Sequence, residues 1–343
     1  MLQISIREAN DIMDKIFQKG DTAVTAFLHS SPGIGKSSIV KQLCKKHSLE
    51  MVDLRLASIE PTDLCGIPYV HNGEQLFSIP DWFPSDPKSK GVIFLDELSN
   101  ASIAVQHVAY RLILDREIQT NRRLPDGWFV VAAGNLKTDQ TGVKGIVPAL
   151  ANRFYTHLEI IPNLSDFTVY ALENRVDERV VGFLNFNSAM LYRAPTSAST
   201  AFPTPRSWVA AAKWLTYDFT DGQLITTLSG CIGEGTATEF LSYMKYFRDL
   251  PDFKKIMNGK LEYKVKLDDL GLLFAVATST MYNLMENHKQ VEAVRNLDKV
   301  LVQLPEDFVM MVFKTLQQTN NHEMISNLIE LKSSYKKIEG FIK

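Results

Sequence analysis

A short loop near the start of the chain has the residue types of a phosphate-binding site. Glycine lets backbone N–H groups turn inward around an anion, and a helix that begins after the loop adds the positive end of its dipole. Lys36 would place a positive charge at the β- and γ-phosphates of a nucleotide, and the Ser37 hydroxyl group could bind Mg²⁺. The residues expected to bind ATP with Mg²⁺ are Pro32, Gly33, Ile34, Gly35, Lys36, Ser37 and Ser38.

The loop departs at one residue from the general pattern G-x-x-x-x-G-K-[ST], because Ser30 stands where the pattern has its first glycine. A serine there requires a backbone conformation that tolerates a Cβ atom. An ordinary glycine-rich turn before a helix is the alternative interpretation. A strand before the loop and an amphipathic helix after it favour phosphate binding.

Two acidic residues, Asp96 and Glu97, close an apolar segment later in the chain. Because parallel sheets bind ligands outside the carboxyl ends of their strands, these acids would lie beside the loop. Asp96 would hold Mg²⁺ through a water molecule, and Glu97 would polarise the water that attacks the nucleotide. A pair of acids after a strand is more often a solvated loop, so the catalytic interpretation depends on the phosphate-binding loop.

Three further residues could complete a catalytic site. Asn135 ends another apolar segment and could orient the same water, while Arg153 and Arg206 could neutralise charge that develops on the γ-phosphate. Taken alone, Asn135 is more typical of a turn, and each arginine is more typical of a surface ion pair. Their assignment depends on the family resemblance given below.

Strands alternate with helices in the first half of the chain, which predicts a mostly parallel sheet covered by helices on both faces. An opening helix has Ile16 and Phe17 at helical spacing and should end at Gly20. Another helix should cover about 101–115. The expected strands lie at 23–28, 51–56, 91–97, 128–135 and 157–161.

No buried strand is expected after Asn163, where apolar residues recur at helical spacing. Residues 1–163 are therefore predicted to form a nucleotide-binding α/β domain, and residues 164–343 an all-α domain. A stretch rich in proline and glycine at about 57–90 forms an insert in the first domain. The expected helices of the second domain are 207–219, 239–250, 268–285, 306–318 and 323–336.

The composition is that of a folded protein of 343 residues with a net charge of -2. This charge gives no overall basic field that would attract nucleic acid or an anionic membrane. Cys44, Cys65 and Cys231 are widely separated, which indicates free thiols in a reducing compartment. The N-terminus has no apolar signal-peptide core, and no apolar run is long enough to span a bilayer. A cytoplasmic protein without membrane segments is expected.

The order of these motifs resembles that of AAA+ ATPases, and specifically of the MoxR-like and dynein-related (AAA_5-type) family. The resemblance covers roughly residues 1–300. Ser30 replaces the usual glycine of the Walker A motif. The segments that carry the resemblance are Walker A at 30–37, Walker B at 93–97, sensor 1 at 132–135, the arginine-finger segment at 152–154, sensor 2 at 205–208 and the start of the insert at 63–68.

The resemblance implies an α/β P-loop AAA+ domain, with its parallel sheet sandwiched by helices, followed by an α-helical lid. It also implies a homo-oligomeric ring, commonly a hexamer, that hydrolyses ATP at subunit boundaries. Arg153 would act on the nucleotide of the neighbouring subunit, and Arg206 would reach ATP from the lid. Family members typically act as chaperones that remodel a partner protein, often one that carries a von Willebrand factor A domain.

Four aromatic residues of the insert, Tyr69, Phe77, Trp82 and Phe83, would then contact the partner or line the pore. Packing of these rings onto their own domain is an equal alternative. A nucleic-acid motor or loader is another function for such a fold, but the near-neutral charge and the lack of an appended DNA-binding module disfavour it. A nucleotide-dependent switch without turnover is disfavoured by the presence of Glu97.

Overall fold

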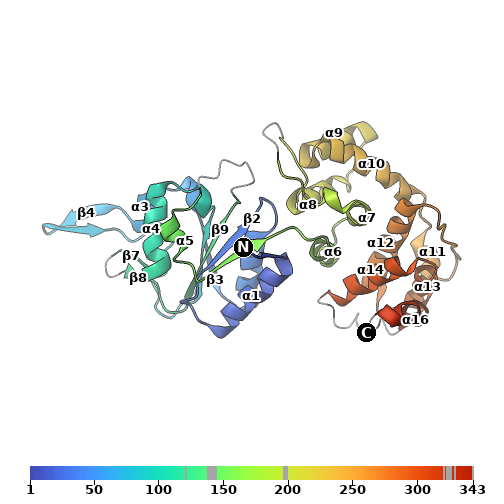
Figure 1. Cartoon of the computed structure of the whole chain (residues 1–343), viewed down its shortest axis with the longest axis horizontal. Coiled ribbons are helices and arrows are strands. Elements are labelled where there is room, and N and C mark those ends of the chain that lie inside the picture. The colour runs from blue at the N-terminus through green and yellow to red at the C-terminus, as the bar shows by residue number, and fades with distance from the viewer. Residues whose placement is uncertain are drawn as a thin grey trace. The chain divides into compact units, whose positions relative to one another are not determined.

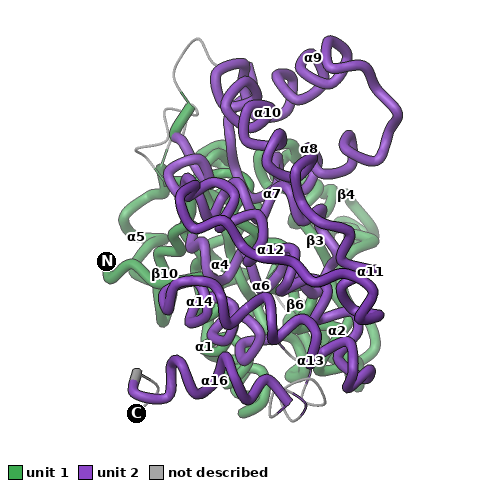
Figure 2. The backbone as a smooth tube through the Cα atoms, turned by 90° about the vertical axis from the view of Figure 1, so that its right-hand side faces the viewer, with its two compact units in different colours: residues 1–162, 194–197 green, residues 163–193, 198–343 purple. Residues whose placement is uncertain are grey.

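The chain divides after Pro162 into two compact units, and the segment 194–197 groups with the first of them (Figure 2). The computed structural model describes residues 1–119, 122–136, 145–195, 200–319, 321, 327 and 330–341. No helix within these ranges is long and apolar enough to cross a membrane.

The first unit is built on a six-stranded sheet in which every neighbouring pair is parallel (Figure 1). The strand order is β1-β10-β2-β9-β6-β3, so β2 lies between β10 and β9. The carboxyl ends of β2, β9 and β6 therefore lie side by side at one edge of the sheet. In sequence order the strands are β1 (Gln3–Ile4), β2 (Ala26–Ser30), β3 (Glu50–Arg55), β6 (Gly91–Asp96), β9 (Trp128–Gly134) and β10 (Thr156–Ile160).

Helices cover both faces of this sheet. On one face, Ile93 and Leu95 of β6 form a hydrophobic core with Val105 of α4 (Ile103–Asp115). On the other face, Phe17 of α1 (Ile6–Lys19) lies against Phe129 of β9, with 4.7 Å between ring centroids. Helix α2 (Lys36–Lys46) follows β2. The predicted parallel sheet between helices is confirmed.

Some boundaries differ from the sequence-based prediction. The strand expected at 23–28 begins only at Ala26, because the backbone N–H of Val24 bonds the carbonyl of Asp21 at 3.2 Å and closes a turn. The opening helix ends as predicted at Gly20, which adopts φ +73°, a conformation that glycine reaches without a Cβ penalty.

The insert contains a short helix and an exposed β-hairpin. A 3₁₀ turn, η1 (Leu56–Ser58), and α3 (Pro61–Cys65) lead into β4 (Pro68–His71) and β5 (Glu74–Phe77). The hairpin turn is Asn72–Gly73, with φ of +51° and +81°. Asn–Gly is the pair that a two-residue hairpin turn favours, because both residues tolerate positive φ.

A second small hairpin, β7 (Glu117–Gln119) and β8 (Arg122–Arg123), follows α4. The side-chain amide of Gln119 donates to the carbonyl of Ser78 at 3.0 Å and also contacts the carbonyl of Cys65. This contact fastens the base of the insert to β7. Two further short elements of the unit are η2 (Leu98–Asn100) and α5 (Pro148–Ala151).

The second unit has only helices among its described residues, as predicted. Its core contains Phe183, Trp208 and Phe240, whose ring centroids lie 5.3–5.5 Å apart. The predicted helix at 323–336 falls partly outside the described residues. The helices are α6 (Leu164–Glu173), α7 (Glu178–Phe186), η4 (Ser188–Met190), α8 (Pro205–Trp214), α9 (Asp221–Ile232), α10 (Glu234–Arg248), α11 (Phe253–Met257), α12 (Leu270–Asn287), α13 (Val291–Leu301), α14 (Glu306–Gln317), α16 (Lys332–Ile338) and η6 (Glu339–Phe341).

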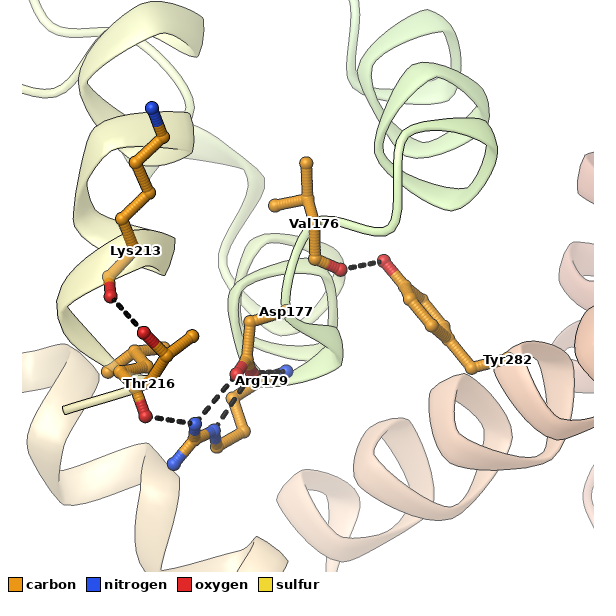
Figure 3. Close-up of polar contacts among 7 residues, drawn as sticks. Val176, Asp177, Arg179, Lys213, Thr216 and Tyr282 are labelled. Atoms are coloured by element: carbon orange, nitrogen blue, oxygen red, sulfur yellow. Dashed lines mark hydrogen bonds and ion pairs between the residues drawn. The ribbon is translucent and has the colours of Figure 1, made fainter. Parts of the chain in front are cut away.

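A polar cluster connects three of these helices (Figure 3). Arg179 donates to both carboxylate oxygens of Asp177, at 2.6 and 2.8 Å, and to the carbonyl of Leu215 at 3.0 Å. Tyr282 of α12 donates its hydroxyl proton to the carbonyl of Val176 at 2.8 Å. Arg179 thereby satisfies a backbone carbonyl at the C-terminal end of α8.

Candidate functional site

The phosphate loop, defined here as Ser30–Ser38, connects the end of β2 to the start of α2. Gly33 and Gly35 adopt φ of +78° and +119°, which L-residues rarely reach. A Cβ atom on Gly35 would also lie 2.8 Å from Cδ1 of Ile6. The two glycines are therefore required by the backbone of the loop. Ser30, in contrast, belongs to the extended strand and accommodates its side chain.

The ammonium group of Lys36 is buried and is held by oxygen atoms. Its Nζ donates to the carbonyl of Ser30 at 2.8 Å, to the Ser30 hydroxyl at 2.9 Å and to Oδ1 of Asn135 at 3.1 Å. The lysine side chain is 9% exposed. A buried cation requires such partners, because desolvation is otherwise costly. Ser30, which departs from the general pattern, thus supplies an additional acceptor to Lys36.

Ser37 and Asp96 meet at the same edge of the sheet. The Ser37 hydroxyl donates to Oδ2 of Asp96 at 3.1 Å. A hydroxyl and a carboxylate oxygen are hard donors, which Mg²⁺ prefers. The pair therefore fits the magnesium site expected from the sequence.

Glu97 follows Asp96 directly and has an unusual backbone. Its φ is +57°, and its N–H donates to Oδ1 of Asp96 at 2.8 Å. The carbonyl of Glu97 accepts from the N–H of Asn100 at 2.9 Å. A left-handed conformation at a residue other than glycine costs about 1–2 kcal/mol. The turn after β6 therefore holds Glu97 in place at an energetic cost.

Asn135 is positioned by a residue that the sequence did not single out. Its backbone N–H donates to the hydroxyl oxygen of the buried Ser99 at 3.0 Å. Ser99 lies in η2, directly after Glu97 and Leu98. This bond joins the turn that carries Glu97 to the strand end that carries Asn135. No local pattern marks Ser99, because its partner is distant in sequence.

Arg153 does not take part in the contacts of Lys36, Ser37, Asp96 and Asn135 given above. Its guanidinium carbon lies 4.2 Å from the ring centroid of Tyr110 in α4, and its Nη2 also contacts the Tyr110 hydroxyl. A cation over an aromatic ring is held electrostatically by the ring quadrupole. Tyr110, which sequence reasoning missed, therefore fixes the direction of the Arg153 side chain.

Arg206 belongs to the second unit, in the first turn of α8, and is exposed. Thr204 caps that helix by accepting from the N–H of Ser207 at 3.0 Å, and Ser207 completes a capping box. The other end of α8 is bound by Arg179, as described above. The start of α8 is thus well defined within its own unit.

The aromatic residues of the insert divide into two pairs. Tyr69 and Phe77, in the hairpin, are 48% and 37% exposed. Trp82 and Phe83 pack against the core of the first unit, and Nε1 of Trp82 donates to the carbonyl of Asp63 at 3.0 Å. Only the first pair offers an exposed apolar surface.

In comparisons with known proteins, residues 26–161 match the family model described as "ATPase family associated with various cellular activities (AAA)". No curated protein matches the chain. A point mutant of RuvB from Thermotoga maritima is 15% identical, with a TM-score of 0.41, and covers 75% of this chain and 76% of that chain.

Two other solved structures are similarly distant. Thermotoga maritima RuvB, described as a Holliday junction branch migration motor, is 14% identical over 75% of this chain and 78% of that chain, with a TM-score of 0.39. A presumed ATPase from Cytophaga hutchinsonii ATCC 33406 is 12% identical over 95% of this chain and 80% of that chain, with a TM-score of 0.35. Similarities at this distance assign no substrate or partner.

Proposed function

Because residues 26–161 form a domain of the AAA ATPase family, we propose that the protein is a magnesium-dependent AAA+ mechanoenzyme that hydrolyses ATP. One observation carries the proposal. At the start of the helix after β2, Lys36 donates to Asn135, which follows β9, and Ser37 donates to Asp96, which ends the adjacent strand β6. These are the groups that phosphate binding, metal binding and water orientation require.

Each residue has a separate task in this proposal. Lys36 binds the β- and γ-phosphates and exchanges the amide oxygen of Asn135 for phosphate oxygens. Ser37 and Asp96 hold Mg²⁺, which neutralises charge on the phosphates. Glu97 accepts a proton from the attacking water. Asn135, released from Lys36, orients that water.

Replacement of Lys36 by alanine is expected to abolish detectable ATP binding, because the loop then loses its only side-chain cation aimed at the phosphates. Lys46→Ala is the matched control, since Lys46 ends the same helix but pairs with Asp14 at 2.8 Å on the surface. Calorimetric titration with ATP and Mg²⁺ measures both variants. Normal affinity in a folded Lys36→Ala protein would contradict the assignment.

The finer assignment is to the MoxR-like family, working as a homo-oligomeric ring and most simply as a hexamer. One observation supports a ring. Arg153 lies against Tyr110 and outside the contacts of Lys36, as expected for an arginine that serves a neighbouring subunit. A separate part of the proposal is that Arg206, at the start of α8, reaches ATP from the helical lid.

The substrate of the motor is proposed to be a protein, with a von Willebrand factor A domain as the leading candidate. The exposed hairpin of the insert supports a protein partner, because Tyr69 and Phe77 offer apolar area to a binding surface. The net charge of -2 does not favour a DNA motor. We place the protein in the cytoplasm, which agrees with its three unpaired cysteines.

Replacement of both Tyr69 and Phe77 by serine is expected to leave basal ATP turnover unchanged and to weaken partner binding by about tenfold or more, as when exposed anchors are lost. The partner is first captured on the ATP-locked Glu97→Gln protein and identified by mass spectrometry. Titration of the purified partner then measures its affinity.

Trp82→Ala serves as the contrasting variant. Because Trp82 packs on the core, its replacement should lower the melting temperature and leave partner affinity unchanged. Undiminished partner affinity in the serine variant would exclude the hairpin as the contact. Tight binding to DNA with a steep salt dependence would contradict the protein-remodelling role and favour a nucleic-acid motor.

A further inference from the structure

Two histidines from adjacent strands form a hydrogen-bonded pair next to the segment that carries Arg153. Nε2 of His29 in β2 and Nδ1 of His157 in β10 are 2.9 Å apart, and the rings stack with centroids 5.1 Å apart. Nε2 of His157 lies 2.9 Å from the carbonyl oxygen of Ala151. Because a carbonyl only accepts, neutral His157 donates from Nε2 and accepts at Nδ1 from His29.

One end of this chain of bonds holds the turn of Arg153. Ala151 is the last residue of α5, two positions before Arg153. The carbonyl of Arg153 itself accepts from the hydroxyl of Thr25 at 3.3 Å. Phe154 lies between the same elements, with its ring centroid 5.6 Å from that of His157. The backbone on both sides of the arginine is therefore attached to β10 and to the start of β2.

The other end reaches the phosphate loop. His29 directly precedes Ser30, whose carbonyl and hydroxyl oxygens bind Lys36. Burial is the largest cause that lowers the pKa of His29, to about 4, and the nearby charge of Lys36 adds to it. His29 is consequently neutral at pH 7 and keeps its role as a donor to His157.

We propose that His157 is a positioning residue for Arg153. By holding the carbonyl of Ala151, it fixes the turn at 151–154 against the strands that lead to the phosphate loop. The turn then presents Arg153 to the nucleotide of a neighbouring subunit in one direction. The inference rests on the proposed function, since it needs an arginine that acts in hydrolysis.

Two conservative substitutions separate the bonds of His157. His157→Gln places an N–H at about the position of Nε2 and can still donate to Ala151. His157→Asn offers an oxygen at about the position of Nδ1 but does not reach Ala151. We expect His157→Asn to lower kcat by about 10–100-fold, the scale of a misplaced catalytic group, with the Kd for ATP unchanged. His157→Gln should retain most of the activity.

The control is His47→Asn. His47 is also a half-buried histidine of the first unit, but it bonds Asp14 of α1 at 2.7 Å. Its kcat should equal that of the parent protein. Should His157→Asn fail to fold, His157→Phe keeps the ring contacts with Phe27 and Phe154 and lacks both nitrogens. Circular dichroism and thermal melting identify which variants are folded.

The decisive measurement is made in the Arg153→Ala background. If His157 acts through Arg153, His157→Asn lowers kcat no further there. An equal loss in both backgrounds, or a loss of ATP affinity in place of kcat, would overturn the inference. If the parent protein hydrolyses ATP and His157→Asn has the same kcat, only the role of His157 is excluded. If the parent protein does not hydrolyse ATP, the proposed function is excluded as well.

Discussion

Replacement of Arg153 by alanine is expected to lower ATP hydrolysis by about 10³–10⁵-fold, the effect found for arginines that neutralise transition-state charge at a transferred phosphate. ATP binding should change little, because Lys36, Ser37 and Asp96 keep their contacts in the same subunit. Steady-state phosphate release and calorimetric ATP titration measure the two quantities separately. Tyr110→Leu is a useful second variant, since it keeps Arg153 but removes the aromatic ring against which the guanidinium group lies.

Mixing experiments test whether Arg153 acts on a neighbour. Arg153→Ala and Glu97→Gln damage different partners of one composite site, so mixed rings contain some interfaces with both residues intact. Partial recovery of hydrolysis on mixing is therefore expected. An absence of recovery at every ratio, with mixed rings verified by native mass spectrometry, would count against action in trans. A fully active monomer would refute the ring.

Replacement of Glu97 by glutamine is expected to lower hydrolysis by about a hundredfold or more, because the attacking water loses its proton acceptor. ATP binding should remain, and the complex should accumulate. Glutamine keeps the size of the side chain and bears the same backbone cost at φ +57°, so the comparison isolates the charge. Single-turnover hydrolysis measures the effect.

Asp96→Asn distinguishes metal binding from water activation. This variant should shift the Mg²⁺ concentration needed for ATP binding, because Asp96 contacts Ser37 at the expected metal position. If Glu97→Gln hydrolysed ATP at the rate of the parent protein, a residue other than Glu97 would have to activate the water.

The central sheet could be predicted from the sequence because its middle strands, β2, β6 and β9, are buried on both faces. Runs such as 91–95 and 128–133 are almost wholly apolar, a pattern that few structures other than parallel strands produce. The hairpin of the insert was missed for the opposite reason. Its strands are exposed on both faces and show no alternation, and only the Asn72–Gly73 pair marked the turn.

The site could be predicted in part. Lys36, Ser37 and Asp96 are marked by local motifs, and the topology of the sheet brings them together. Ser99 and Tyr110 carry no motif, because each contacts a residue that is distant in sequence, and the bond of His157 to the carbonyl of Ala151 depends on how a strand packs against the turn before it. Such supporting contacts arise from tertiary packing, which a single sequence does not encode in any local pattern.

The left-handed backbone of Glu97 sets conformational stability against catalysis at one position. Glycine there would relieve about 1–2 kcal/mol of strain, and asparagine would relieve part of it. In the proposed role of Glu97, a selection for thermal resistance alone would favour replacements that raise the free energy of unfolding and remove ATP turnover. In that role, the glutamate places its carboxylate at the expense of folding free energy, and the local strain is a conformational cost of turnover.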